Sequence, residues 1–469
     1  MSTIQKNVKS TIDFINTQFL IGEYVISTKL PYLDNEIASI VLTESKLAIC
    51  ISTSELIAQA NRSKILGSDL DIVLKSAKCN IRWNFKNYKG FNLLFPINSK
   101  LTIQIFPTIY SVEVSRTVEP PFFRMIATSK HEHQHTSMSN FWKCDYLQLP
   151  ELDLTTTSGI SELQVNEHKV QVFSFKYEQT FFIIIESRSK IIKSEFLELS
   201  NGILLGFAFA NAKLYRNHLL LVSLNEHDGV SPVKYDYLEG EKDCYSSYGF
   251  FPTVPFQLEF GVEPQAICYL NKIWFQEIIL KIIADNNYKR GIELLVADEN
   301  IEPKSRSLIY SVALETISNI VYRGNDVSMS LLKEKSLRQN IINHLVVTLD
   351  KFIDKLSPEA YSTILSKLKN ISNPSNKKKL LFPYDLYGIT LTEIEKQIIS
   401  QRNSLLHGRL PKLDYISNYD ILQVNLTLYY CVATLFLKVA GYSGPIIYHP
   451  TLHQIYSKKE TSDYLVKII

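Results

Sequence analysis

The sequence has few cysteines and no pattern among them. Its six cysteines, at 50, 79, 144, 244, 268 and 431, form no C-x-x-C pair and no framework spacing in 469 residues. Nothing therefore indicates a disulfide scaffold, and we expect reduced, mostly buried thiols. The first residues are polar and lack the apolar core of a signal peptide. Together these absences predict a cytoplasmic protein.

Long uninterrupted apolar runs are also missing. The most apolar long segment, 421–440, contains Gln423, Asn425 and Lys438. A membrane span needs about 20 nearly uninterrupted apolar residues, so we expect a core helix here and no membrane partner. The sequence has no P-loop and no convincing G-x-G-x-x-G. We expect neither a cofactor nor a bound metal.

Positive charge is in small excess overall, and it is unevenly distributed along the chain. The formal net charge is +3, whereas residues 265–469 hold 25 Lys and Arg against 19 Asp and Glu. A basic half permits a polyanionic partner. The composition, 45% hydrophobic and 21% charged, is that of an ordinary globular protein. At this length it predicts two or three domains.

The pattern of apolar residues changes near 250–264. Before it, short runs rich in Ile, Val, Phe and Tyr predict strands, and 194–211 resembles a helix. After it, helical periodicity continues to the end, apart from a basic connection at 371–390 that reads most simply as a solvated loop. The sequence thus predicts an α+β protein with a β-rich region at 1–255 and an all-α helical bundle at 265–469. Expected strands are 38–53, 78–85, 91–95, 101–106, 110–116, 170–177 and 181–187; expected helices are 266–286, 288–298, 303–322, 329–356, 358–370, 392–407 and 417–441.

One predicted helix, 392–407, carries an unusual arginine. Thr392 and Glu395 have the S/T-x-x-E spacing of a capping box, and Gly408 supplies a stop signal. At about 100° per residue, Arg402 lies in the middle of the apolar face, flanked by Asn403 and His407. A guanidinium does not lose its proton and is costly to bury unpaired. Arg402 must therefore meet an anion, either a carboxylate of this protein or a phosphate.

The stretch from Arg402 to His407 has the form R-N-x-x-x-H and is followed by Gly408. With the helix containing V-A-L-E at 312–315 and the closing helix ending L-K-V-A-G-Y at 437–442, it resembles the HEPN superfamily (higher eukaryotes and prokaryotes nucleotide-binding). More narrowly, it looks like the ApeA-type anti-phage HEPN proteins. The resemblance covers roughly 265–447, and the family also places a β-rich half before this domain.

The resemblance implies a metal-independent endoribonuclease. His407 would be the general acid and base, Arg402 would clamp the phosphate, and Asn403 would orient the imidazole or a phosphate oxygen. Glu315 is the candidate to hold Arg402. The substrate would be RNA (tRNA or mRNA), the molecule a homodimer through the HEPN domain, and the setting abortive infection with a phage-derived trigger sensed by the N-terminal region.

Basic residues near the motif extend this interpretation. Some HEPN toxins carry a tyrosine two residues beyond the motif histidine, where a partner enzyme adds nucleotides. This chain has Arg409 there, which argues against that control and adds a cation to the site. Lys377, Lys378 and Lys379 are candidates for contact with the nucleic-acid backbone.

Other interpretations remain open. Two further arginine–histidine pairs have similar spacing, Arg124 with His131 and Arg338 with His344. In the structural alternative, Arg402 pairs only with an internal acid such as Glu315, leaving a catalytically silent scaffold that binds RNA or a protein. A second alternative makes the β-rich half a ligand-binding module that the helices dimerise.

Other histidines lie close together at 131, 133 and 135, and again at 449 and 453. The first group could bind zinc but is read as a surface loop. We place His449 and His453 on the surface.

Overall fold

A computed structural model shows that the chain is an α+β protein made of two compact units. The strand unit comprises Met1–Tyr245 and Tyr269–Leu280, and the helical unit comprises Ser246–Cys268 and Lys281–Ile469. The structure describes residues 23–27, 37–43, 46–53, 72–76, 82–94, 101–113, 122–129, 160–177, 180–211, 213–214, 218–225, 232–239, 244–245, 249–251, 256, 259–261, 272–296, 301–323, 334–371, 374–406, 421–457 and 464–469.

The first six strands of the strand unit close on themselves. Their order is β3-β2-β1-β4-β5-β6, and β3 also pairs with β6, with Ile49 opposite Ile105 and Ile51 opposite Ile103. All these pairings are antiparallel. Closure leaves no free edge among them. The strands are β1 (Glu23–Ser27), β2 (Ile37–Thr43), β3 (Lys46–Thr53), β4 (Ile72–Ser76), β5 (Arg82–Leu94) and β6 (Leu101–Glu113).

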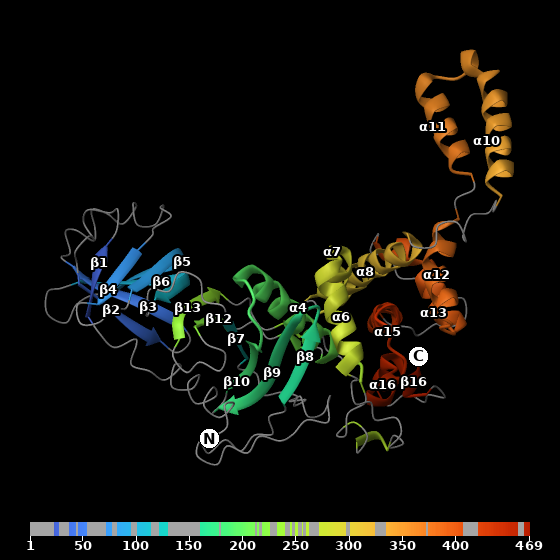
Figure 1. Cartoon of the computed structure of the whole chain (residues 1–469). Coiled ribbons are helices and arrows are strands. Elements are labelled where there is room, and N and C mark those ends of the chain that lie inside the picture. The colour runs from blue at the N-terminus through green and yellow to red at the C-terminus, as the bar shows by residue number, and fades with distance from the viewer. Residues whose placement is uncertain are drawn as a thin grey trace. The chain divides into compact units, whose positions relative to one another are not determined.

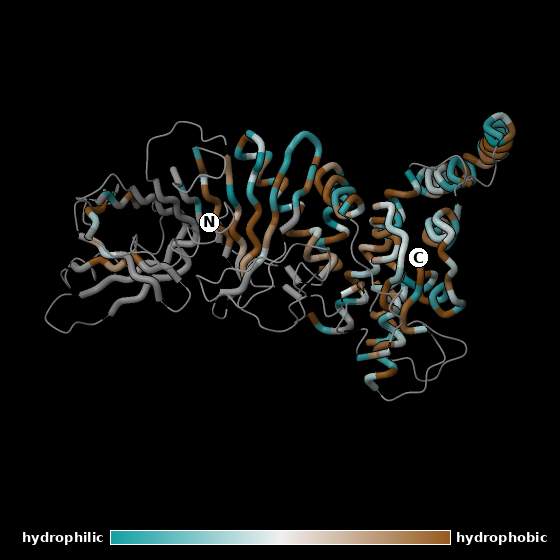
Figure 2. The backbone as a smooth tube through the Cα atoms, turned by 60° about the horizontal axis from the view of Figure 1, so that its bottom comes forward, coloured by the Kyte–Doolittle hydropathy of each residue, from teal (hydrophilic) through white to brown (hydrophobic). Residues whose placement is uncertain are grey.

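The sheet then continues from β6 as an open antiparallel array in the order β13-β12-β7-β10-β9-β8. Figure 2 shows several strands of this array coloured brown along their middles, which agrees with the buried residues of β7, β10 and β12. The strands are β7 (Phe122–Ser129), β8 (Ile160–Val165), β9 (His168–Tyr177), β10 (Thr180–Ser187), β12 (His218–Leu224) and β13 (Pro232–Glu239); β11 (Lys213–Leu214) and β14 (Cys244–Tyr245) form a separate pair.

One helix and the larger part of another complete the strand unit. Helix α4 (Lys193–Asn211) packs on β7, where Phe196 stacks on Phe123 with ring centroids 5.6 Å apart. Helix α6 (Lys272–Ala284) packs in turn on α4 through Phe275 and Phe207, at 4.8 Å. The helix expected at 194–211 is therefore present. The sequence put α6 with the helical half, but residues up to 280 cluster with the strands.

Several strand boundaries differ from the sequence prediction because pairing, and not local pattern, sets strand length. The expected strands 78–85 and 91–95 belong to one strand, β5, which pairs with β6 through a register shift between Tyr88 and Gly90. The expected strands 101–106 and 110–116 likewise merge into β6, which runs through Pro107. The expected strand 38–53 is instead the hairpin of β2 and β3.

The helical unit is built around α15 (Ile421–Val439), whose residues Gln423 to Leu437 are all buried. Helices α8, α7, α13 and α16 pack against it, and α8 also contacts α7, α12 and α14 (Figure 1). The bounds are α7 (Asn286–Leu295), α8 (Pro303–Arg323), α10 (Lys335–Asp350), η4 (Ile353–Lys355), α11 (Pro358–Lys369), α12 (Asn376–Leu386), α13 (Glu393–Ser400), α14 (Arg402–Leu406), α16 (His449–Tyr456), and the paired strands β15 (Pro445–Ile447) and β16 (Val466–Ile468).

Close packing of α7 on α15 depends on one glycine. A Cβ on Gly291 would lie 2.2 Å from the ring of Phe436, so no larger residue fits without movement. Tyr288, one turn earlier, donates its hydroxyl hydrogen bond to the Phe436 carbonyl oxygen at 2.8 Å. The two helices are therefore locked by a close approach and a buried hydrogen bond.

Helix α15 is also the described helix with the length and apolarity that a membrane span would need. In this structure, 83% of its 18-residue apolar window is buried inside the protein. The hydroxyl groups of buried Thr427 and Thr434 donate hydrogen bonds to the carbonyl oxygens of Gln423 and Tyr430, each at 2.8 Å. Such burial is that of a core helix, and length and composition alone are weak evidence for a span.

The helical unit begins earlier than expected, because residues near 250 pack on it. Phe250 is fully buried and stacks on Tyr429 with ring centroids 4.9 Å apart. Its carbonyl oxygen accepts the N–H of Ile447 at 2.8 Å. The sequence placed 250 in the β-rich region 1–255, whereas it belongs with the helices.

Candidate functional site

Arg402 is the first residue of α14 and is only 7% exposed. Its Nη2 is paired with Oε2 of Glu315, and its Nη1 donates to Oδ1 of Asn403 at 2.6 Å. Its Nε is buried and has no hydrogen-bond partner among the described residues. Burial lowers the pKa of Arg402 from its ordinary value, yet a guanidinium remains charged at any physiological pH. The site therefore holds one cation whose Nε donor is unused among the described residues.

Glu315 comes from α8, which contacts α7, α12, α14 and α15. Its side chain is 50% exposed, in contrast to the 8% of the Arg402 side chain. The carboxylate thus reaches the guanidinium from a position open to solvent. The contact between Glu315 and Arg402 that the sequence suggested is present, and it is common to the catalytic and the purely structural interpretations.

The helix expected at 392–407 is two helices, not one. The capping box at its start is present: Thr392 Oγ1 accepts the Glu395 N–H at 3.2 Å, and Glu395 Oε2 accepts the Thr392 N–H at 2.7 Å. Helix α13 ends at Ser400, and Gln401 lies between it and α14. The interruption sets Arg402 at the start of a new turn directed at α8, with which α14 is in contact.

His407, Gly408 and Arg409 lie outside the described residues. Helix α14 ends at Leu406, so His407 follows it directly in the sequence. The structure brings together Arg402, Asn403 and Glu315, and it does not describe the imidazole expected to complete the group.

The three lysines expected in a loop lie on a helix instead. Lys377, Lys378 and Lys379 form the first turn of α12, which is capped by Ser375 accepting the Lys378 N–H at 3.3 Å. Buried Leu380 and Tyr384 hold the helix against the core, which explains why the segment is not a solvated loop. Lys379 Nζ lies 4.8 Å above the ring of Tyr322, on the α8 helix that also carries Glu315. Lys377 and Lys378 are exposed.

The competing arginine–histidine pairs occupy different settings. Arg338 and His344 lie on α10, a helix with one buried residue, Leu349, and His344 is exposed. Arg124 lies inside the sheet on β7, 2% exposed, with Nε donating to Glu186 of β10 at 2.9 Å. Arg124 thus has a structural partner, and its expected histidine, His131, lies outside the described residues together with His133 and His135.

His449 is not on the surface, contrary to the sequence prediction. It is 1% exposed, and its Nε2 hydrogen-bonds the Gly249 carbonyl oxygen at 2.9 Å. Its ring meets Phe250 and Tyr429 edge-on, at 5.8 and 5.5 Å. Burial lowers its pKa to about 4, so the ring is neutral near pH 7. Spacing from His453 gave no sign of this, because Gly249 is 200 residues away in the chain.

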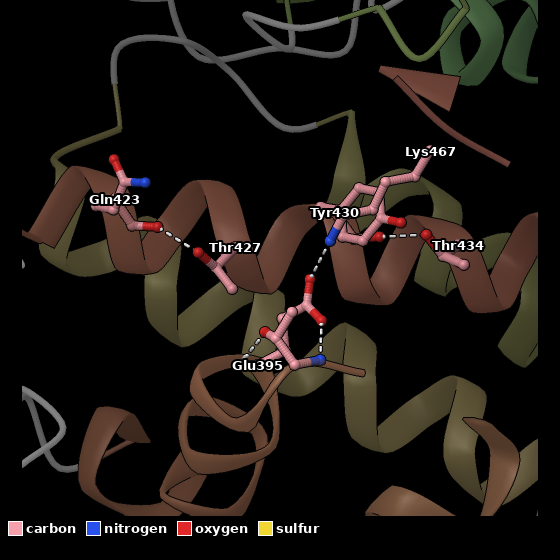
Figure 3. A network of polar contacts seen from close by, with 7 residues as sticks. Glu395, Gln423, Thr427, Tyr430, Thr434 and Lys467 are labelled. Carbon is pink, nitrogen blue, oxygen red and sulfur yellow. Dashed lines mark hydrogen bonds and ion pairs between the residues drawn. The ribbon is translucent and has the colours of Figure 1, made fainter. Parts of the chain in front are cut away.

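A second polar group, unforeseen in the sequence, lies at the other end of α13. Glu395 is completely buried and pairs with Lys467 of β16, Nζ to Oε1, at 3.1 Å (Figure 3). Lys467 also lies 3.4 Å from the Tyr448 ring centroid and 5.2 Å from that of Tyr430. Burial, and then the charge of Glu395, raises the pKa of Tyr430. Tyr430 therefore remains neutral beside the ion pair.

Within the residues that the structure describes, no group of three or more His, Cys, Asp or Glu side chains is arranged to hold a metal ion. The chemistry available at the described part of the site is that of a fixed guanidinium, an amide and a partly exposed carboxylate. Guanidinium and amide N–H groups are donors of the kind that can bind a planar or tetrahedral oxyanion. Comparison with protein-family models gives no match, and neither do comparisons with curated proteins and with solved structures.

Proposed function

We propose that this chain is a metal-independent endoribonuclease of the HEPN type. The observation that carries the proposal is the state of Arg402: a guanidinium buried at the start of α14, held by Glu315 and Asn403, with Nε not engaged by any described group. A guanidinium held in this way suits a phosphate, whose oxygens accept charge-assisted N–H bonds. The family resemblance of the R-N-x-x-x-H sequence supports the same interpretation.

In the proposed reaction the ribose 2′-oxygen attacks the adjacent phosphorus, and the bond to the 5′-oxygen of the next nucleotide breaks. His407 accepts the 2′-OH proton and returns a proton to the leaving 5′-oxygen, because imidazole titrates near neutral pH. Arg402 stabilises the charge on the non-bridging oxygens. The products are a 2′,3′-cyclic phosphate and a 5′-OH, so no water or metal enters the step.

The remaining residues take supporting roles in this proposal. Glu315 and Asn403 fix the guanidinium before substrate arrives, since both contact it directly. Lys377 and Lys378, exposed on the first turn of α12, bind the RNA backbone at a helix that contacts α8. Arg409 adds a cation beside the motif. We place the activity in a cytoplasmic homodimer that acts in anti-phage defence, with the strand unit sensing the trigger.

The test is cleavage of total tRNA and of a transcribed mRNA by the purified chain in the presence of EDTA. We expect Arg402→Ala and His407→Ala each to reduce cleavage by about 100-fold or more, with cyclic-phosphate ends on the wild-type products. The matched controls are Arg338→Ala and His344→Ala, which remove the same side chains from α10 and should cleave normally. Unchanged cleavage by the Arg402 and His407 variants, or its loss in the controls, contradicts the proposal.

One observation favours a second candidate, a helical scaffold that binds RNA or a partner protein without cutting. The charge of Arg402 is already balanced inside the chain by Glu315. If the chain is a scaffold, the wild-type protein should leave labelled RNA intact. This should hold at concentrations at which the protein binds that RNA in a gel-shift assay. Light scattering separately tests the dimer in either case, with a mass near twice 53.9 kDa expected.

A further inference from the structure

The first turn of α13 is tied to a strand that follows it in sequence by about seventy residues. Glu395 contributes one carboxylate oxygen, Oε2, to the Thr392 N–H of the capping box, and the other, Oε1, to Lys467 Nζ. Figure 3 shows the carboxylate directed at the lysine beside the Tyr430 ring of α15. One buried side chain thus caps α13 and binds β16.

The carboxylate depends on this lysine. Glu395 is 0% exposed, and an ionised carboxylate so placed is costly unless it is both paired and hydrogen-bonded. Among the described residues, Lys467 supplies its ion pair. Lys467 is itself held by β16, which pairs with β15 through Ile446 opposite Lys467, and by the Tyr448 ring.

A short segment, α13 and Gln401, connects the pair of Glu395 and Lys467 to Arg402. Helix α13 has eight residues, about 12 Å at 1.5 Å per residue. Its start is fixed to β16 by Glu395, the helix packs on α15, and its residues Ile398 and Ile399 are buried. Gln401 then joins it to α14, where its carbonyl oxygen accepts the Ser404 N–H at 2.8 Å. Arg402 is therefore held between two anchors, Glu395 before it and Glu315 beyond it.

We infer that Lys467 is a positioning residue for Arg402, acting through Glu395. The lysine touches neither Arg402 nor any proposed reacting atom. It neutralises the buried carboxylate that fixes α13, and α13 fixes the start of α14. The mechanical part of this inference stands on the contacts alone, while its consequence for catalysis rests on the proposed function.

The experiment is hydrogen–deuterium exchange of the full chain, read at residues 393–406. Lys467→Met keeps most of the stem over Tyr448 but removes the charge, and we expect at least tenfold faster exchange there. Lys467→Arg restores a cation and should stay within threefold of wild type. The double variant Glu395→Gln with Lys467→Met removes both charges while Gln retains an oxygen for the Thr392 N–H. Its exchange rate at 393–406 should also stay within threefold of wild type.

A matched control lies on the same helix. Lys396 pairs with Glu393 at 2.8 Å, both on the surface, so Lys396→Met removes an equal charge from an exposed pair. It should change exchange at 393–406 by less than twofold. The inference is overturned if Lys467→Met has no larger effect than Lys396→Met, or if the double variant exchanges as fast as Lys467→Met. Failure of Lys467→Met alone to fold, with Lys467→Arg and the double variant folded, supports it.

Cleavage assays on the same variants separate this inference from the proposed function. If the chain is a ribonuclease, Lys467→Met should lower its kcat by tenfold or more while KM stays within twofold of wild type. Lys467→Arg should restore kcat. Unchanged kcat in Lys467→Met overturns the catalytic part. If the wild-type chain cleaves no RNA, the proposed function fails while the exchange measurement still decides whether Lys467 positions the Arg402 segment.

Discussion

At the scale of single residues, the pair between Arg402 and Glu315 combines a buried cation with a half-exposed anion. Such a pair lies between two known limits. Exposed ion pairs contribute about 0.2–1 kcal/mol, whereas breaking a fully buried pair costs about 3–5 kcal/mol. The Glu315 side chain is far more exposed to water than that of Arg402, so removing one partner should not cost the same stability as removing the other.

A double-mutant cycle measures how much the pair of Arg402 and Glu315 contributes to stability. We expect Glu315→Gln and Arg402→Met to couple by about 1–2 kcal/mol in the free energy of unfolding, as measured by urea titration. Glu315→Gln should be the more damaging single change, because it leaves the buried cation without its anion. A coupling below about 0.3 kcal/mol would mean that the contact does not hold Arg402 in solution.

His449 makes the stability of the helical unit depend on pH. Its pKa is about 4 in the folded chain against an ordinary 6.5. Above pH 6.5 neither state binds the proton and stability is complete; between 6.5 and 4 the unfolded state binds it first, and stability falls. From pH 7.5 to 5.0, wild type should lose about 2 kcal/mol more than His449→Gln in urea unfolding followed by circular dichroism. Equal losses in the two proteins would refute this assignment.

At the scale of elements, the contact of α7 with α15 sets a limit on side-chain size. Gly291→Ala would place its Cβ 2.2 Å from the Phe436 ring, closer than two carbon atoms can lie without movement. Overpacking of this kind costs about 1–3 kcal/mol, although alanine favours a helix. We expect a lower urea midpoint for Gly291→Ala, and recovery when Phe436→Leu is added. A rise in midpoint would show that helix propensity decides at this position.

Elements were predictable where local signals decide. The capping box of Thr392 and Glu395, the helix starting at Pro303 and the strands β9 and β10 follow from residues close in sequence. Helix α12 was missed because Pro383 and the lysines resemble a loop, although Ser375 and the Leu380–Tyr384 spacing signal a helix. The break at Gln401 has no local signal, since the helical period continues through it.

Contacts between distant residues were the part of the site that sequence reasoning could not reach. The pair of Lys467 with Glu395 joins residues 72 apart, and no spacing rule links them. Glu315 was found only because a family resemblance pointed to it. The strand order was likewise out of reach, since β6 contacts β13 and β3 together.

At the scale of the whole molecule, the chain passes between its two units three times, near 245, 268 and 280. A chain starting at residue 256 lacks Phe250, which is buried against Tyr429 and His449. A chain starting at 246 keeps it. We expect the longer one to be more stable to urea by about 3 kcal/mol, the usual cost of deleting a buried phenylalanine. Phe250→Ala in the full chain is the control and should lose a similar amount; equal stability of the two truncated chains would contradict the packing.

These three passages between the units limit how gene recombination can exchange one unit for another. A single recombination breakpoint cannot transfer the Arg402 helices intact to another N-terminal region. A cut before 246 carries α6 along without Phe207, and a cut after 280 leaves Phe250 behind. Exchange of one half for another therefore requires two coordinated joints. Shuffled or fused versions made at one junction should expose apolar surface and aggregate.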